Sequence, residues 1–305
     1  MPNPLLVITG PTATGKTRRA VECALALNGE IISADSRQIY RGMDIGSGKD
    51  IEEYGSVPYH LIDIHPAGYQ YNLYEFLRDY KQSRGDIESR GHLPILCGGT
   101  GMYVEAAVKG TVLPSIGRNE KLRQMLEQKS PEELTAILAS LRPLHNTSDP
   151  NNPRRTIRAI EIAMHSGQEP SATVHSDTGS DNAAIIGVSI DRDTRRTRIT
   201  ERLRSRLQAG MIEEVARLLD QGVPADTLIA YGLEYRYVTL YLTGQLARTE
   251  MEQLLEIAIH QFAKRQMTWF RGMERRGLTI HWLPYDMPSE EFVQTASELL
   301  NTTMQ

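Results

Sequence analysis

The feature that most limits the possible folds is an octapeptide near the N-terminus. Residues 10–17 read GPTATGKT and match the pattern G-x-x-x-x-G-K-[ST] at every fixed position. The apolar run from Leu5 to Thr9 precedes it and has the composition of a buried strand, and the segment from Lys16 to Leu27 has the pattern of a helix. A strand, a glycine-rich turn and a helix in this order predict a phosphate-binding loop.

The chemistry of such a loop follows from its residue types. Glycines let the backbone wrap closely around a phosphate, so that successive N–H groups and the helix N-terminus point toward the anion. Lys16 supplies a mobile cation, and the hydroxyl of Thr17 can join the ligand shell of a Mg²⁺ ion. We therefore expect a diphosphate or triphosphate to be bound by Gly10, Thr12, Ala13, Thr14, Gly15, Lys16 and Thr17, with Thr17 as the metal ligand.

Further along the chain, strand-like runs alternate with helical patterns. Extended segments are predicted at 30–33, 57–64 and 93–99, with a helix that begins near Leu73. This alternation indicates a parallel sheet with helices on its faces. From about Val112 the chain becomes polar and helical, until a strand pattern resumes at residues 183–190. We predict an α/β, P-loop NTPase-like core (1–111 and 183–305) with a mostly helical insertion domain (112–182), and a last strand, LTIHWLP, before a C-terminal helix.

Composition excludes several classes of protein. With 34 Lys and Arg against 38 Asp and Glu, the 305 residues carry a formal charge of −4, which argues against a protein that coats nucleic acid through a basic surface. The longest apolar runs fall short of the roughly 18 residues that a bilayer helix needs, so we expect no membrane partner. Cys23 and Cys97 lie far apart in apolar surroundings and lack metal-ligand spacing. Because a strand-like run begins at once, we expect no signal peptide and a cytoplasmic location.

Asp35 is the most informative residue outside the loop. It ends the strand-like run IISAD, 18 residues after Thr17, and in a parallel sheet that position lies beside the bound phosphates. There Asp35 can hold a metal through water, act as a base on a nucleophile, or merely cap a turn. Spacing alone does not decide among these roles.

Several motifs together resemble one family. GPTATGKT, ISADSRQIYRGMDIGSGK, VPYHLIDI, GGTGMY, NPRRTIRAIE and AKRQMTWFR are similar, in this order, to segments of the bacterial tRNA dimethylallyltransferases, also called tRNA isopentenyltransferases. The resemblance covers roughly residues 4–273. It implies transfer of the dimethylallyl group from dimethylallyl diphosphate to N6 of adenosine-37, in the anticodon stem-loop of a tRNA. It also implies Mg²⁺ as cofactor and diphosphate, rather than a nucleotide, in the loop. We expect a monomer.

The resemblance also implies roles for individual residues. Asp35 matches the general base that contacts the amine of the flipped-out adenine, and Thr100 matches a threonine that lines the reaction channel. Arg123 matches an arginine that reaches the substrate. Two stretches match segments that contact the tRNA: Ser36, Arg37 and Gln38, and, after the turn Pro150–Pro153, Arg154, Arg155, Thr156, Ile157 and Arg158.

Some segments depart from the family or have no matched role. The C-terminal G-Y-[RK]-[EQ] element is present here only as Gly232–Arg236, and GTAKP is replaced by GSGKD. A dense basic stretch favours an RNA-binding face over a solvated helix; it contains Arg192, Arg195, Arg196, Arg198, Arg202, Arg204 and Arg206. A second basic segment, Lys264–Gln266, is a candidate for a further RNA or phosphate contact. It precedes Trp269 and Phe270, which we predict to be core residues.

Three other functions compete with tRNA prenylation. A prenyltransferase acting on free AMP shares the loop and Asp35, but needs the NPRR segment less. A small-molecule P-loop kinase would consume ATP and ignore dimethylallyl diphosphate. A non-catalytic, nucleotide-gated RNA-binding protein would bind tRNA and leave adenosine-37 unmodified.

Overall fold

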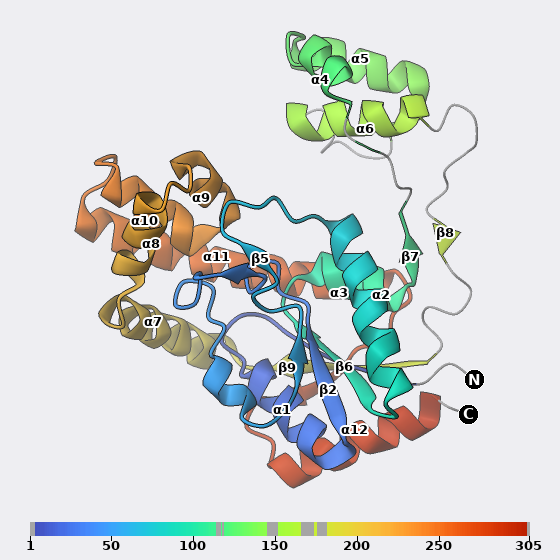
Figure 1. Cartoon of the computed structure of the whole chain (residues 1–305). Coiled ribbons are helices and arrows are strands. Elements are labelled where there is room, and N and C mark those ends of the chain that lie inside the picture. Colours follow the sequence, from blue (N-terminus) through green and yellow to red (C-terminus); the bar gives the residue numbers. More distant parts are fainter. Residues whose placement is uncertain are drawn as a thin grey trace. The chain divides into compact units, whose positions relative to one another are not determined.

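The structure is a computed structural model that describes residues 4–113, 117, 119–144, 152–165, 174–175 and 182–303. The chain divides into two compact units. The larger contains Met1–Thr111 and Ser176–Gln305, and the smaller contains Val112–His175. Each unit is described by itself below, and Figure 1 labels the elements of both.

The larger unit is built on a six-stranded sheet with the order β10-β9-β1-β6-β2-β4, in which every pairing is parallel. Its strands are β1 (Leu5–Thr9), β2 (Gly29–Ser33), β4 (Tyr59–His60), β6 (Leu93–Gly98), β9 (Ala183–Ser189) and β10 (His281–Pro284). The predicted α/β class with a parallel sheet is thus confirmed. Since the strands are parallel, their carboxyl ends meet at one edge, where α/β proteins bind ligands.

Helices cover both faces of this sheet (Figure 1). Leu6 and Ile8 of β1 point to the face covered by α1 (Lys16–Leu27) and α12 (Ser289–Thr303). Leu5 and Val7 alternate to the other face, where α2 (Leu73–Ser89), α3 (Gly101–Val108) and α11 (Arg248–Arg275) pack. All five residues of β1 are buried, as expected for a strand with helices on both sides.

A helical layer adjoins the sheet and has its own core. It contains α7 (Arg192–Gln208), α8 (Met211–Asp220), α9 (Ala225–Tyr231), α10 (Leu233–Leu242) and α11. Met211, Val215 and Tyr235 are buried there, together with Tyr40 and Met43 of the loop that follows β2. The layer therefore holds that loop against the edge of the sheet where the strands end.

The prediction of one long strand at 57–64 is wrong. Only Tyr59–His60 pairs with β2, because Leu61 and Asp63 have φ angles of 62° and 55°, in the left-handed region that ends a strand. The turn brings the Asp63 carboxylate to Lys49, which is fully buried and also donates to the Tyr40 carbonyl. A short parallel pair, β3 (Tyr40–Arg41) with β5 (His65–Pro66), flanks this turn.

The smaller unit has three described helices, α4 (Glu120–Leu126), α5 (Pro131–Leu141) and α6 (Pro153–His165). Their apolar faces meet in a small core that contains Leu126, Leu134, Leu138, Ile157 and Ile160. Two short strands, β7 (Thr111–Val112) and β8 (Val174–His175), form a separate two-stranded sheet. Two predicted loops fall largely in residues 145–151 and 176–181, outside the described residues, and they include Pro150 and Asn151 of the predicted turn.

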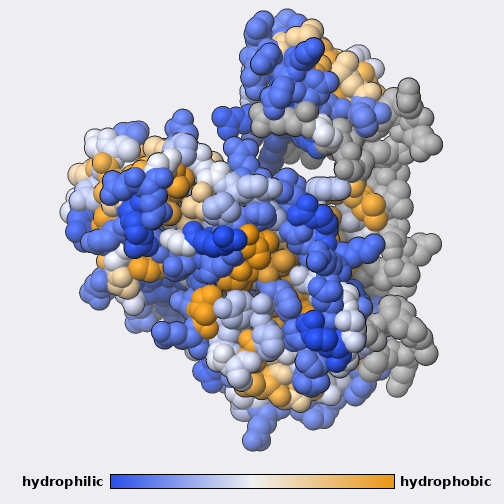
Figure 2. Space-filling model, in the orientation of Figure 1, coloured by the Kyte–Doolittle hydropathy of each residue, from blue (hydrophilic) through white to orange (hydrophobic). Residues whose placement is uncertain are grey.

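The face of the molecule shown in Figure 2 is largely hydrophilic, with hydrophobic side chains gathered in small separate areas. Among the described residues, no helix is both long and apolar enough to cross a membrane.

Candidate functional site

The octapeptide forms the predicted connection between β1 and α1. Gly10, Ala13 and Gly15 have positive φ angles of 152°, 67° and 79°. At Gly10 a Cβ atom would lie 2.9 Å from the Val188 carbonyl oxygen, so only glycine fits there. The Thr14 hydroxyl donates to the Pro11 carbonyl over 3.0 Å and closes the loop. No side chain caps the N-terminus of α1, which leaves its first N–H groups for an anion.

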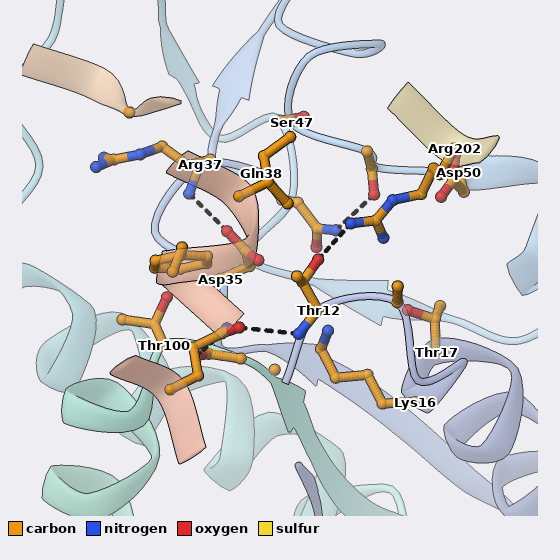
Figure 3. Close-up of a pocket in the computed structure, with 18 of the residues that line it drawn as sticks. Thr12, Lys16, Thr17, Asp35, Arg37, Gln38, Ser47, Asp50, Thr100 and Arg202 are labelled. Carbon is orange, nitrogen blue, oxygen red and sulfur yellow. Dashed lines mark hydrogen bonds between the residues drawn. The ribbon is translucent and has the colours of Figure 1, made fainter. Parts of the chain in front are cut away.

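Asp35 and Thr100 follow neighbouring strands, β2 and β6, and lie close together at the carboxyl edge of the sheet (Figure 3). The Thr100 backbone N–H donates to the Ala34 carbonyl over 3.2 Å, and the Ser36 N–H donates to the Thr100 hydroxyl over 3.2 Å. One carboxylate oxygen of Asp35 accepts from the Arg37 N–H over 2.9 Å. The loops after the two strands are therefore tied together, and Asp35 keeps its other oxygen for a ligand.

Gln38, predicted to contact the target nucleotides, has a structural role here. Its side chain is buried, accepts from the Ser33 hydroxyl over 2.8 Å and donates to the Gly48 carbonyl over 3.1 Å. The carbonyl oxygen and one amide N–H of Gln38 are thus occupied within the chain, but Gln38 also lines the cavity that contains Asp35, and its contact with the target nucleotides stays a prediction. Ser36 and Arg37 are half-buried and line the same cavity as Asp35.

Gln266 of α11 joins the phosphate loop to the loop after β6. Its carbonyl oxygen accepts from the Thr12 N–H over 2.8 Å, and its amide nitrogen donates to the Gly99 carbonyl over 2.8 Å. The side chain is buried, so both hydrogen bonds are shielded from water. The sequence indicated Gln266 only as part of a candidate RNA or phosphate contact, and nothing in the pattern distinguished it as a structural bridge.

Three arginines of the basic stretch enter the site. Arg198, Arg202 and Arg206 of α7 all line the cavity, and Arg202 donates to the Thr12 hydroxyl (Figure 3). Their spacing of four residues places them on one face of the helix, a signal that the sequence already contained. The helix turns these three toward the phosphate loop, while an RNA-binding face on the stretch as a whole stays a prediction.

The cavity is electrostatically positive at the loop. Desolvation lowers the pKa of the Lys16 ammonium, against the opposing effects of Cys97 and Asp35, and the nearby Arg202 and Arg206 lower it further. Desolvation and the like charge of Arg206 lower the pKa of Arg202 to about 10, against the opposing effects of Glu234 and Asp50. Gathering cations out of water is unfavourable unless an anion arrives to neutralise them. The arrangement is thus suited to a highly charged anion such as a diphosphate.

The cavity has a volume of about 680 Å³, and one part of its wall is apolar and aromatic. Met102 of α3 and Ile259, Phe262 and Trp269 of α11 form this wall. Phe270 is fully buried as predicted, but the prediction that Trp269 belongs to the core is wrong, since it is 41% exposed. Its ring lies against Gly101, where a Cβ atom would come within 2.3 Å of the Trp269 Cδ1.

Glu214 positions the loop that follows β3, of which Gly46 lines the cavity. Its buried carboxylate accepts from the N–H groups of Asp44, Ile45 and Gly46 over 2.7, 2.7 and 3.0 Å, and from the Tyr235 hydroxyl over 2.8 Å. The divergent segment Gly232–Arg236 thereby supports the GSGKD loop through Tyr235. No motif in the sequence distinguished Glu214.

The remaining predicted residues lie in the smaller unit. Arg123 donates to both oxygens of the buried Glu161 over 2.8 and 2.7 Å, and Arg158 donates to the same carboxylate over 3.1 Å. Glu161 thus binds the Arg123 guanidinium within the smaller unit, and the contact of Arg123 with the substrate stays a prediction.

Two of the five residues predicted to contact tRNA in this unit are buried. Thr156 is covered and donates to the Asn152 carbonyl, and Ile157 packs in the small core. Their side chains are buried, so a contact with tRNA through the side chains of these two residues is not supported by their exposure, and the wider prediction for this segment stays untested. Arg154 and Arg155 are exposed at the start of α6, and Arg158 is half-buried.

The residues that line the cavity also indicate how the expected Mg²⁺ ion could be held. Thr17 lines the cavity in the first turn of α1, and the carboxylates of Asp50 and Glu53 line the same cavity. Among the described residues, however, no group of three or more His, Cys, Asp and Glu side chains could hold a metal ion. A Mg²⁺ ion fits only if it takes most of its ligands from the diphosphate and water, which is its usual coordination in phosphate sites.

Comparison with protein families gives two matches. The IPP transferase family matches residues 38–273, and the isopentenyl transferase family matches residues 3–55. The chain is 55% identical over 299 residues to tRNA dimethylallyltransferase 1 of Porphyromonas gingivalis, an alignment that covers 97% of this chain and 98% of that protein. It is 53% identical over 300 residues to tRNA dimethylallyltransferase 2 of Bacteroides fragilis, with 97% of each covered.

Solved structures agree with these matches. The full-length tRNA isopentenylpyrophosphate transferase of Bacillus halodurans superposes with a TM-score of 0.74 at 32% identity, over 99% of this chain and 98% of that one. A eukaryotic dimethylallyltransferase acting on tRNA has a TM-score of 0.80 over 99% of this chain and 80% of its own, but at 20% identity this likeness shows the fold alone. This chain belongs to the IPP transferase family, the family of the tRNA dimethylallyltransferases.

Proposed function

We propose that the protein transfers the dimethylallyl group of dimethylallyl diphosphate to N6 of adenosine-37 in tRNA, and releases diphosphate. One observation carries this proposal. The phosphate loop, the Asp35–Thr100 pair and an apolar, aromatic wall line a single cavity. A prenyl diphosphate needs both a cationic and an apolar wall, and a weak nitrogen nucleophile needs a base beside them.

In this reaction the bond between N6 and the allylic carbon forms as the bond from that carbon to the diphosphate oxygen breaks. The free carboxylate oxygen of Asp35 accepts the proton that N6 loses. Lys16, Arg202 and the loop N–H groups stabilise the charge that develops on the departing diphosphate. When bound, Mg²⁺ supplies further neutralisation of that charge, and Thr17 is the residue that would hold it.

The acceptor base must leave its stack to reach Asp35, as in other enzymes that modify bases. Ser36 and Arg37 lie at that position and are proposed to contact the target nucleotides. Arg154 and Arg155 are exposed on α6 and are proposed to bind phosphates of the anticodon stem-loop. We further propose a cytoplasmic monomer. The two buried, unpaired cysteines fit a reducing compartment, and size-exclusion chromatography with light scattering tests the oligomeric state.

The decisive experiment is mass spectrometry of nucleosides from tRNA that has been incubated with the protein, dimethylallyl diphosphate and Mg²⁺. We expect N6-dimethylallyladenosine at position 37. AMP and ATP serve as competing substrates in parallel reactions. Prenylated AMP with unmodified tRNA would favour the free-adenylate enzyme, and ATP consumption without prenyl transfer would favour a kinase. Binding of tRNA with no modified nucleoside after prolonged incubation would refute catalysis.

A further inference from the structure

A second cavity, of about 370 Å³, adjoins the phosphate loop. Pro11 and Ser189, at the carboxyl ends of β1 and β9, form part of its wall, and the rest comes from α7 and α11. Four cationic side chains line it: Arg192, Arg195, Lys264 and Arg271. None of its described lining residues is acidic. Positive charge is therefore concentrated around this cavity, although the net charge of the whole chain is −4.

These four cations have no ionic partner within the described part of the chain, where none of them forms an ion pair. Arg192, Lys264 and Arg271 are exposed, and Arg195 is half-buried. Burial and the neighbouring Arg192 lower the pKa of the Arg195 guanidinium, against the opposing effect of Asp191. Four like charges that face one hollow repel one another, so a polyvalent anion is the ligand that relieves this repulsion.

The second cavity shares its walls with the reaction cavity. Pro11 lines the second cavity and Thr12 lines the first; on α11, Lys264 lines the second and Gln266 the first. The hydrogen bond from Thr12 to Gln266 joins these two walls. The start of the phosphate loop and α11 thus form a partition with one cavity on each side.

A row of arginines on α7 runs past this partition. At 3.6 residues per turn, five arginines fall within about 120° of the helix circumference: Arg192, Arg195, Arg198, Arg202 and Arg206. The first two line the second cavity, and the other three line the reaction cavity. Arg198 stands between them beside the phosphate loop, with a terminal nitrogen 3.8 Å from where a Cβ of Gly15 would lie. Positive charge therefore continues from the second cavity to the phosphate loop.

We propose that the second cavity is an anion site for the diphosphate group, which holds the prenyl diphosphate before it enters the phosphate loop and the released diphosphate after the reaction. This inference rests on the proposed function for the identity of its ligand. A small concave site with a continuous cationic row toward Lys16 fits a compact, mobile anion. An RNA backbone, by contrast, is bound by an extended basic surface.

The kinetic test neutralises two of the four cations, as Arg195→Gln/Lys264→Gln. The matched control is Arg217→Gln/Lys81→Gln, which removes one Arg and one Lys charge from exposed positions of the larger unit that line neither cavity. At low ionic strength we expect kcat/KM for dimethylallyl diphosphate to fall about 10-fold in the test variant, because steering by charge raises association rates by at least that factor. The difference in kcat/KM between the wild type and the test variant should become smaller as the salt concentration rises. The control should match the wild type, and kcat at saturating donor and the Kd for tRNA should be unchanged in the test variant.

The binding test needs no tRNA. Inorganic diphosphate is titrated calorimetrically into Lys16→Ala, which weakens the phosphate loop, and into Lys16→Ala combined with Arg195→Gln/Lys264→Gln. We expect a residual diphosphate site in the first protein and its loss in the second. The proposal is overturned if kcat/KM for dimethylallyl diphosphate is unchanged in Arg195→Gln/Lys264→Gln, whether or not this variant binds tRNA more weakly. It is also overturned if the residual diphosphate site of Lys16→Ala persists when Arg195→Gln/Lys264→Gln is added. Failure of the wild type to prenylate tRNA would refute the proposed function alone, because the titration reads the second site independently.

Discussion

The substitution Gly98→Ala tests whether Asp35 and Thr100 act as a pair that is held by the sheet. Gly98 ends β6, and a Cβ atom built on it would lie 2.3 Å from the Ala34 carbonyl oxygen and 2.7 Å from the Ala34 Cα. These are backbone atoms of the neighbouring chain segment, so no rotamer change relieves the overlap. An ordinary contact begins near 3.4 Å, and the two segments must therefore separate by about 1 Å.

That separation acts directly on the site. The Ala34 carbonyl accepts from the Thr100 N–H over 3.2 Å, and Asp35 is the next residue. Misplacement of a reacting group by about 1 Å costs on the order of 100-fold in rate. Overpacking of this kind also destabilises a fold by about 1–3 kcal/mol, which a sheet of this size tolerates. We thus expect a folded protein whose kcat falls about 100-fold.

The assay is single-turnover prenyl transfer to tRNA with saturating donor, alongside calorimetric titration of inorganic diphosphate. Diphosphate affinity should change little, because the phosphate loop follows β1 and the overlap is with the segment after β2. The control is Gly85→Ala in the middle of α2, where a Cβ atom meets nothing within 4 Å. It should keep full activity and gain about 0.5–1 kcal/mol of stability. A Gly98→Ala enzyme with wild-type kcat would show that the Asp35–Thr100 geometry does not limit the reaction.

Three further predictions follow from single contacts. Asp35→Asn should abolish prenyl transfer while diphosphate binding persists, and wild-type turnover would show that Asp35 is not the base. Arg154→Ala/Arg155→Ala should weaken tRNA binding and lower the slope of log Kd against log salt by about 2, whereas an unchanged slope would remove α6 from the interface. Desolvation alone would raise the pKa of the buried Glu30, but hydrogen bonds from Arg90 and two histidines outweigh it and lower this pKa to about 2. The ionised form of Glu30 therefore stabilises the fold above about pH 4.5, and this contribution disappears as the pH falls toward 2. Urea titrations at several pH values should show a loss of about 3 kcal/mol that is absent in Glu30→Gln.

The local chemistry of the phosphate site was readable from the sequence. The octapeptide, its flanking strand and its helix were predicted where they occur, because glycine spacing and short-range hydrophobic patterns act within a few residues. The parallel sheet followed from alternating strands and helices. The arginine spacing on α7 was also visible, but only the packed helix showed that one face of it turns toward the phosphate loop.

Tertiary structure decided which side chains of the predicted segments are exposed. Gln38, Thr156 and Ile157 are all buried, and neighbours in space occupy the side chain of Arg123, although each stood in a segment that resembles a binding motif. Gln266 and Glu214 became important for the opposite reason, since each joins segments far apart in the chain. Hydrogen-bond satisfaction in a buried site depends on partners brought together by folding, and no local pattern records those partners. The sequence by itself determined the phosphate chemistry, while the fold selected the residues that surround it.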